Sequence, residues 1–152
     1  MEFIEFLDRT EVEIIKMVKK AGYKTAENTE LCLLSKNYVG FLHKRKKEII
    51  ICTNNAKERE GYTLRKKKNK EIFDRTALHI KKALRHEAVH VAQECNDGNL
   101  LKLDRKQSMN PSKINALNGS IRISGEEEKE RQAYILEDNP RLIKNELRKY
   151  CL

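Results

Sequence analysis

A helix predicted from about Asp74 or Thr76 to Cys95 limits the fold of this chain more than any other feature. Apolar residues recur through it at helical spacing, and an Asn-Asp-Gly turn ends it. His86 and His90 lie four residues apart on this helix, so their side chains share one face about one turn apart. The neighbours Leu84, Ala88, Val89, Val91 and Ala92 are uncharged in a chain that is 36% charged, which indicates that this part of the helix can be buried.

His86, Glu87 and His90 form the pattern H-E-x-x-H. Two imidazoles on one helix face can bind one metal ion, and the adjacent carboxylate can reach a water on that ion without being a ligand. A zinc hydrolase uses this arrangement. The alternative is an amphipathic helix with two incidental histidines, because so short a motif also occurs by chance. His79, two turns before His86, is too distant to be a ligand and is expected in packing or at the surface.

A catalytic zinc ion needs a third protein ligand. No histidine follows His90, so a carboxylate on the next predicted helix, Ser124 to about Asp138, is indicated. Glu130 is preferred because it is the first carboxylate clear of the first turn, and the small Ala133 allows the two helices to approach. Glu137, on the same face, is the main rival or a residue that orients a histidine. The other carboxylates considered are Glu126, Glu127, Glu128 and Asp138.

Two further side chains are candidates for supporting roles. Tyr134, one turn from Glu130, is a candidate donor to the substrate carbonyl oxygen, with a packed aromatic as the alternative. Gln93, one turn past His90, either supports that histidine or is exposed. In the expected reaction, a zinc-bound water with its pKa lowered towards about 7 gives its proton to Glu87 and attacks a peptide carbonyl. Glu87 then passes the proton to the leaving amine.

The chain resembles the gluzincin metallopeptidases, in which a glutamate on a later helix completes an H-E-x-x-H site. The nearer likeness is to the family of the mitochondrial inner-membrane peptidase that processes and assembles an ATP synthase subunit. It is carried by Cys52-Thr53-Asn54 after an apolar strand and by Cys95, five residues after His90. Glu130-Arg131-Gln132-Ala133 is similar to that family's E-x-R-A motif.

This resemblance covers about Cys32 to Ala133 and departs from the family in two places. Glu128 stands where that family has a cysteine, and Tyr134–Asp138 replaces a run of small residues and a cysteine. It implies a zinc metallopeptidase with Zn²⁺ on His86, His90 and Glu130 and with a protein or peptide as substrate. In zincins an edge strand of the sheet can also hold an extended substrate, and the sequence leaves open which strand is the edge.

The whole chain, 1–152, is expected to be one α+β domain, a minimal zincin in which a small sheet precedes the motif helix. A capping box at Thr10–Glu13 predicts a helix ending at Gly22, with Phe3–Leu7 as an earlier turn. Tyr38–Leu42 and Glu48–Cys52 predict a β-hairpin whose second strand is inside the sheet. Further expectations are a strand-like run at Leu31–Leu34, a loop from Ala56 to Phe73, an irregular segment from Leu100 to Ser124 and a last helix from Asn139-Pro140.

The net charge is +9, with basic tracts at His43–Lys47 and Arg65–Lys70. These tracts are expected to be solvated loops rather than a nucleic-acid interface, because no aromatic residues are interleaved with them. The alternative function is a non-catalytic domain that binds nucleic acid or serves as an adaptor. No apolar run approaches the roughly 20 residues of a membrane span. The acidic start Met1–Asp8 is unlike a signal peptide, so a soluble, cytoplasmic protein is expected, and no oligomeric state is indicated.

The four cysteines, Cys32, Cys52, Cys95 and Cys151, form no C-x-x-C pair, so no structural zinc knuckle is indicated. Buried free thiols are favoured over disulfides because the chain shows no signal for secretion. A contact between Cys52 and Cys95 is the pairing left open.

Overall fold

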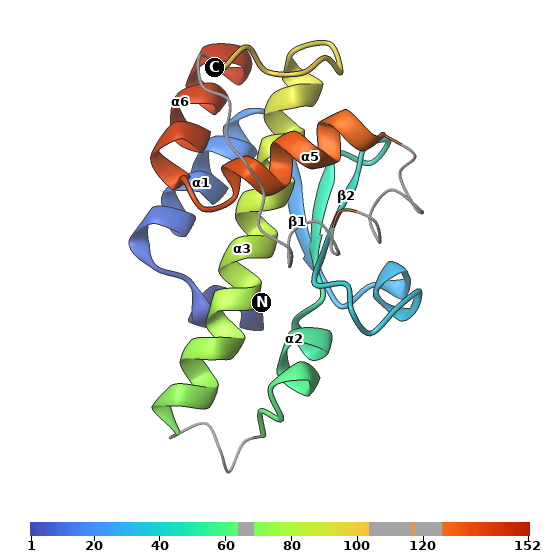
Figure 1. The fold of residues 1–152 in the computed structure, drawn as a ribbon, viewed down its shortest axis with the longest axis vertical. Coiled ribbons are helices and arrows are strands. Elements are labelled where there is room, and N and C mark those ends of the chain that lie inside the picture. Colours follow the sequence, from blue (N-terminus) through green and yellow to red (C-terminus); the bar gives the residue numbers. More distant parts are fainter. Residues whose placement is uncertain (64–68, 104–116, 118–125) are drawn as a thin grey trace.

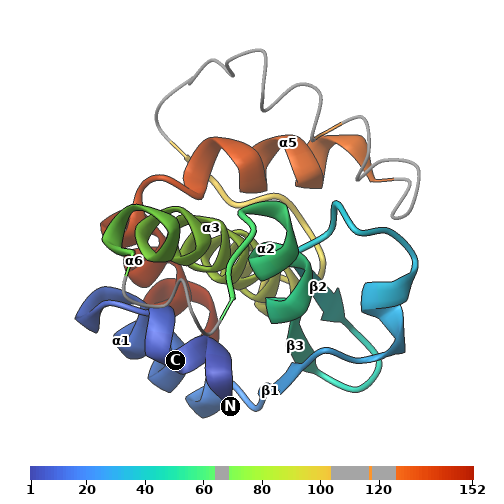
Figure 2. The same ribbon diagram turned by 90° about the horizontal axis from the view of Figure 1, so that it is seen from below.

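The computed structural model describes residues 1–63, 69–103, 117 and 126–152 as an α+β fold around one long helix (Figure 1). In chain order its elements are the 3₁₀ helix η1 (Glu2–Phe6), α1 (Arg9–Lys20), β1 (Lys24–Glu27), the 3₁₀ helix η2 (Glu30–Leu33), β2 (Gly40–His43), β3 (Glu48–Ile51), α2 (Thr53–Arg59), α3 (Lys70–Cys95), α5 (Glu127–Leu136) and α6 (Pro140–Cys151). α5 lies on one side of α3, and α1 and the sheet lie on the other (Figure 2).

β3 is the central strand of the sheet, which confirms its predicted inner position. It pairs antiparallel with β2, Gly40 opposite Ile51, and parallel with β1, Lys24 opposite Glu48. β1 was not predicted because its sequence, Lys-Thr-Ala-Glu, lacks apolar alternation. The expected strand at Leu31–Leu34 is wrong, since this run forms η2 and the following turn.

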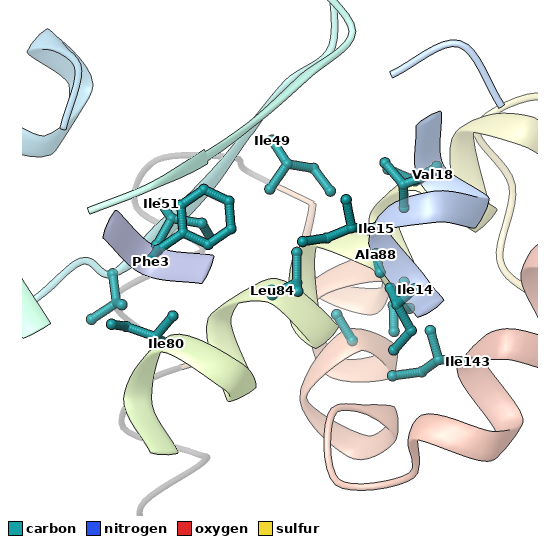
Figure 3. Packing of buried hydrophobic residues seen from close by; sticks show 14 of the residues in the cluster. Phe3, Ile14, Ile15, Val18, Ile49, Ile51, Ile80, Leu84, Ala88 and Ile143 are labelled. Atoms are coloured by element: carbon teal, nitrogen blue, oxygen red, sulfur yellow. The ribbon is translucent and has the colours of Figure 1, made fainter. Parts of the chain in front are cut away.

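The core lies between α3, the inner face of the sheet and the helices α1 and α6 (Figure 3). Ile49 and Ile51 point the same way because alternate residues of a strand share a face. They pack near Ile80 and Leu84 of α3, and Phe3 of η1 closes this end of the core. Burying one such side chain contributes about 1.5–3 kcal/mol, so α3 is fixed mainly by its packing.

The prediction of a charged loop from Ala56 to Phe73 is wrong at its two ends, which are helical, while the described residues between α2 and α3 are not in a helix or strand. α2 occupies its start, and α3 begins at Lys70, where the Asn69 side chain accepts a hydrogen bond of 3.2 Å from the backbone of Ile72. Ala56 is fully buried and Phe73 packs on the core. A few inward-facing apolar residues are therefore enough to make this charged sequence amphipathic helix.

α1 begins at Arg9 rather than near Thr10, because Asp8 is its N-cap. Glu11 completes the capping box, its carboxylate accepting a hydrogen bond of 3.2 Å from the backbone of Asp8. η1 is a separate 3₁₀ helix and not an earlier turn of α1, since Leu7 between them is extended.

All four cysteines are paired, so the expectation of free thiols is wrong. Cys32 is bonded to Cys52, and Cys95 to Cys151. The pairing left open, Cys52 with Cys95, is wrong as well. η2 brings Cys32 to the end of β3, and α6 packs along α3 and brings Cys151 to its end. Four cysteines permit three connectivities, and only the tertiary fold distinguishes them.

The observed start of the last helix agrees with its prediction, whereas the start of the helix before it cannot be compared. The cap predicted at Ser124 lies outside the described residues, as does most of the segment Leu100 to Ser124. α6 begins as predicted, with Pro140 in its first turn and the Asn139 side chain accepting a hydrogen bond of 3.1 Å from the backbone of Leu142. None of the helices in the described part of the chain is both long and apolar enough to cross a membrane.

Candidate metal centre

α3 and α5 bring three metal-binding side chains to one buried point. His86 and His90 of α3 and Glu130 of α5 are each less than a tenth exposed. The Glu130 carboxylate oxygens lie 3.1 Å from Nε2 of His86 and 3.1 Å from Nε2 of His90. One donor atom from each side chain lies within 4.8 Å of the others. The structure therefore gathers the three residues that the sequence predicted as ligands.

The local sequence explains why two histidines can be buried here. Every residue from His86 to Gln93 is buried, so this part of α3 is covered on all sides. Ala133 of α5 is fully buried, and its small side chain lets α5 approach α3 closely. Polar groups in such a place must be paired, either with protein groups or with a bound ion.

Each histidine has a second partner at its other ring nitrogen. Nδ1 of His86 lies 3.2 Å from Glu137 Oε2, and Nδ1 of His90 lies 2.8 Å from Gln93 Oε1. The Gln93 amide also donates a hydrogen bond of 3.1 Å to a backbone carbonyl of α5. Such partners fix which ring nitrogen faces a metal ion. The structure thus places Glu137, the rival third ligand, behind His86 and places Glu130 between the two imidazoles.

Nε2 of His90 carries the strongest sign of a missing partner. It is buried and makes no hydrogen bond, although a Glu130 oxygen lies 3.1 Å away. An unpaired buried polar group costs about 1–3 kcal/mol. A metal ion held by the three side chains would take up the lone pair of this nitrogen. Two imidazole nitrogens with one carboxylate are also a donor set of catalytic zinc, so the residues fit this ion.

The electrostatics of the site agree with this fit. Burial disfavours the charged form of His86, but hydrogen bonds to Glu130 and Glu137 outweigh it and raise the pKa of His86 to about 10. Burial likewise disfavours the Glu130 carboxylate, but the close contacts with the His86 and His90 rings hold the pKa of Glu130 well below its usual range. A metal ion would replace the proton that His86 and Glu130 share, so metal binding competes with protonation.

Glu87 lies beside the three side chains and is 6% exposed. Burial raises the pKa of its carboxyl, while His86 and His90 oppose this shift. Gly40 of β2 is its neighbour across the cleft, since a Cβ added there would lie 3.3 Å from Cγ and 3.4 Å from Oε1 of Glu87. The missing side chain therefore lets the β2 backbone come close to this carboxylate. Gly40 was not predicted as a residue of the site, although a glycine inside a strand pattern can mark such a close approach.

A cleft of about 290 Å³ opens onto these residues. Its base is α3, and one side is formed by residues of the segment Asn37 to Lys44, hereafter the strand wall. The opposite side is α5, where the Tyr134 ring lies 4.3 Å from the His86 ring, centroid to centroid, and lines the cleft. β2 is thus the edge strand beside the cleft. His79 also lines it and contacts Glu60 at 2.8 Å, so it is a cleft residue rather than a ligand.

The fold and these side chains define a small α+β protein with a buried His–His–Glu group able to bind a metal ion. The chain matches the family described as Domain of unknown function (DUF8637) over residues 3–152, and it belongs to that family. No curated protein and no solved structure matches it.

Proposed function

We propose that this protein is a zinc-dependent metallopeptidase of the gluzincin type on a minimal zincin-like fold. The observation that carries the proposal is the buried group His86, His90 and Glu130 with Glu87 beside it, at the base of an open cleft. A buried histidine pair with an orienting partner on each ring is costly to build unless the free nitrogens have a ligand.

His86, His90 and Glu130 would hold the zinc ion, which when bound supplies a Lewis acid that acidifies water and polarises a carbonyl. Glu87 accepts a proton from the attacking water at its carboxylate and delivers it to the leaving amine. The raised pKa of Glu87 suits this role, because a base transfers protons best when its pKa is near the working pH.

The surroundings of the site support a peptide as substrate. β2 is at the edge of the sheet formed by the described residues, and a sheet edge can bind an extended peptide through its backbone donors and acceptors. Tyr134 lines the opposite side of the cleft and remains the candidate donor to the carbonyl oxygen. Glu137 and Gln93 hold the two imidazoles in place from behind.

Hydrolysis of a mixture of denatured proteins, followed by mass spectrometry of the products, tests the proposal. The zinc-loaded protein should cut, a chelator should stop it, and added zinc should restore it. Glu87→Gln should keep zinc and lose activity about a hundredfold or more, the scale of a lost general base. Glu128→Gln, an exposed carboxylate on α5, is the matched control and should retain both.

Unchanged cutting by Glu87→Gln would contradict the assignment of the base. Zinc binding without hydrolysis of any substrate would favour the alternative function, a non-catalytic basic domain that binds nucleic acid or another protein.

A further inference from the structure

The cleft has basic side chains at both of its ends along α3, and the two ends differ in how these charges are paired. At the end near the C-terminus of α3, Lys44 lies 2.9 Å from Glu126 of α5 and 3.5 Å from Glu94 of α3. Glu126 also pairs with Lys129 at 3.1 Å. This end, hereafter the paired end, therefore has its basic groups matched by carboxylates of the protein itself.

The opposite end, hereafter the basic end, carries Arg59, His79 and Lys82. Arg59 donates a hydrogen bond of 2.8 Å to the backbone carbonyl of Asn37, and no carboxylate of the described chain pairs with it. Lys82 lies 3.7 Å from Asp138, with side chains 39% and 51% exposed, so this long pair is weak.

The remaining acid near the basic end is already engaged twice. Glu60 lies 2.8 Å from His79 and 2.9 Å from Arg75. Arg59 and Lys82 line the cleft at this end, whereas Glu60 and Asp138 do not, so the charge that faces the cleft there is positive. Glu87, Glu130 and Glu137 surround the metal centre, and their carboxylates offset the charge of a zinc ion held there. Among the described residues that line the cleft, the basic end has no such carboxylates, so it is the end that favours a substrate carboxylate.

Spacing along α3 relates this charge to the reaction site. Lys82 is four residues before His86, about 6 Å along the helix. An extended peptide rises about 3.3 Å per residue, so Lys82 lies roughly two residues from a bond held at the metal centre. We infer that the cleft selects peptides with an acidic residue two or three positions from the cleaved bond, on the side that lies over Arg59 and Lys82. This inference rests on the proposed peptidase function.

Binding of two fluorescent pools of random decapeptides tests the inference without hydrolysis. One pool contains Asp and Glu, and the other contains Asn and Gln in their place. Zinc-loaded Glu87→Gln protein should bind the acidic pool about tenfold more tightly at low salt, the scale of two partly exposed ion pairs. Adding Arg59→Gln and Lys82→Gln should remove this difference while zinc content and circular dichroism stay unchanged.

The matched control adds Arg9→Gln and Lys19→Gln, which remove the same charge from exposed positions on α1. α1 lies on the other side of α3 from α5 and contributes no residue to the cleft (Figure 2). This control should keep the preference for the acidic pool. The inference would be overturned if both pairs of substitutions reduced the preference for the acidic pool equally, because binding would then follow net charge alone. It would also be overturned if the Glu87→Gln protein showed no preference between the two pools.

Mapping the bonds cut by the zinc-loaded wild-type protein separates this inference from the proposed function. Acidic residues should be enriched two or three positions from the cut, on one side only. Cutting without that enrichment overturns the inference and leaves the peptidase proposal intact. Acid-selective binding that depends on Arg59 and Lys82, together with no cutting of any peptide, supports the basic end as a ligand site and contradicts the peptidase proposal.

Discussion

α3 forms the base of the cleft and the segment from Cys32 to Cys52 contributes one of its sides, yet the two are held in place differently. α3 is 26 residues long and is packed against the sheet and the helices α1, α5 and α6. The other segment consists of η2, two strands of four residues each, and turns. His86, His90 and Glu87 thus stand on the long packed helix. The strand wall, in contrast, is mostly half-buried or exposed, although β3 behind it is part of the core.

A disulfide and a set of side-chain hydrogen bonds hold the strand wall in place. The disulfide between Cys32 and Cys52 closes the segment that contains it. The Asn55 side-chain amide lies 2.9, 3.2 and 2.9 Å from the backbone carbonyls of Cys32, Ser35 and Tyr38. Damage to α3 should therefore remove the metal site with the fold, whereas damage to the strand wall should affect substrate binding and spare the metal.

The largest effect is expected from Leu84→Ala on α3. Leu84 is fully buried against the sheet, and such truncations cost about 2–5 kcal/mol out of a total stability of about 5–15 kcal/mol. Urea unfolding should show this loss, and zinc should bind more weakly. Leu78→Ala, on the same helix but 44% exposed, is the control and should change stability by no more than about 0.5 kcal/mol. Equal effects would mean that α3 is not the centre of the core.

A smaller and more selective effect is expected from replacing Cys32 and Cys52 together by serine. Opening a loop of 20 residues costs about 3 kcal/mol by the chain-entropy estimate. Zinc content should stay near one per chain, while KM for a peptide substrate rises because the strand wall loosens. Replacing Cys95 and Cys151 by serine is the matched control, and it should lower stability without raising KM. A rise in KM for both pairs would remove the proposed difference between the two regions.

The disulfides also bear on where the protein works. Disulfides form and persist in oxidising compartments, whereas the N-terminal sequence predicted a cytoplasmic protein. The cytoplasmic location stays a prediction, and trapping the thiols of the protein in its own cells would test it.

The smallest effect on stability and the most local effect on activity are expected from Gly40→Ala. The added Cβ would lie 3.1 Å from Ala83 Cβ and 3.3 Å from Glu87 Cγ, so Glu87 must shift by a few tenths of an ångström. Hydrolysis should fall about tenfold with zinc content unchanged, because small misplacements of reacting groups are costly. Gly22→Ala is the contrasting variant. Its φ of +91° makes alanine strained, but no atom lies within 4 Å of the new Cβ, so stability should fall and activity should not.

The same contrast explains what the sequence could and could not predict. α3 was predictable because a long apolar repeat and the His86–His90 spacing lie within one element. The central strand was predictable from the apolar run that contains Ile49 and Ile51. β1 and η2 were not, because elements of four residues with mixed polarity have no periodic signal. The cysteine pairs likewise depend on contacts distant in sequence.

The residues of the candidate site likewise fall into those that the sequence could predict and those that depend on the tertiary fold. The two histidines and Glu87 could be predicted because one helix turn relates them. Glu130 and Glu137 share a face of α5, so the sequence alone left them as rivals, and the packing of α5 on α3 decides which one lies between the imidazoles. Arg59 was not predicted to be near the site, because the fold, and no local pattern, brings α2 to the end of the cleft.

The central claim is that His86, His90 and Glu130 hold one zinc ion. A crystal of the zinc-loaded protein, measured at the zinc absorption edge, tests it most directly. We expect one anomalous peak at roughly 2.0–2.2 Å from Nε2 of both histidines and from a Glu130 oxygen, with Glu137 hydrogen-bonded to Nδ1 of His86. A peak bonded to Glu137 with Glu130 turned away, or no peak between the two histidines, would contradict it.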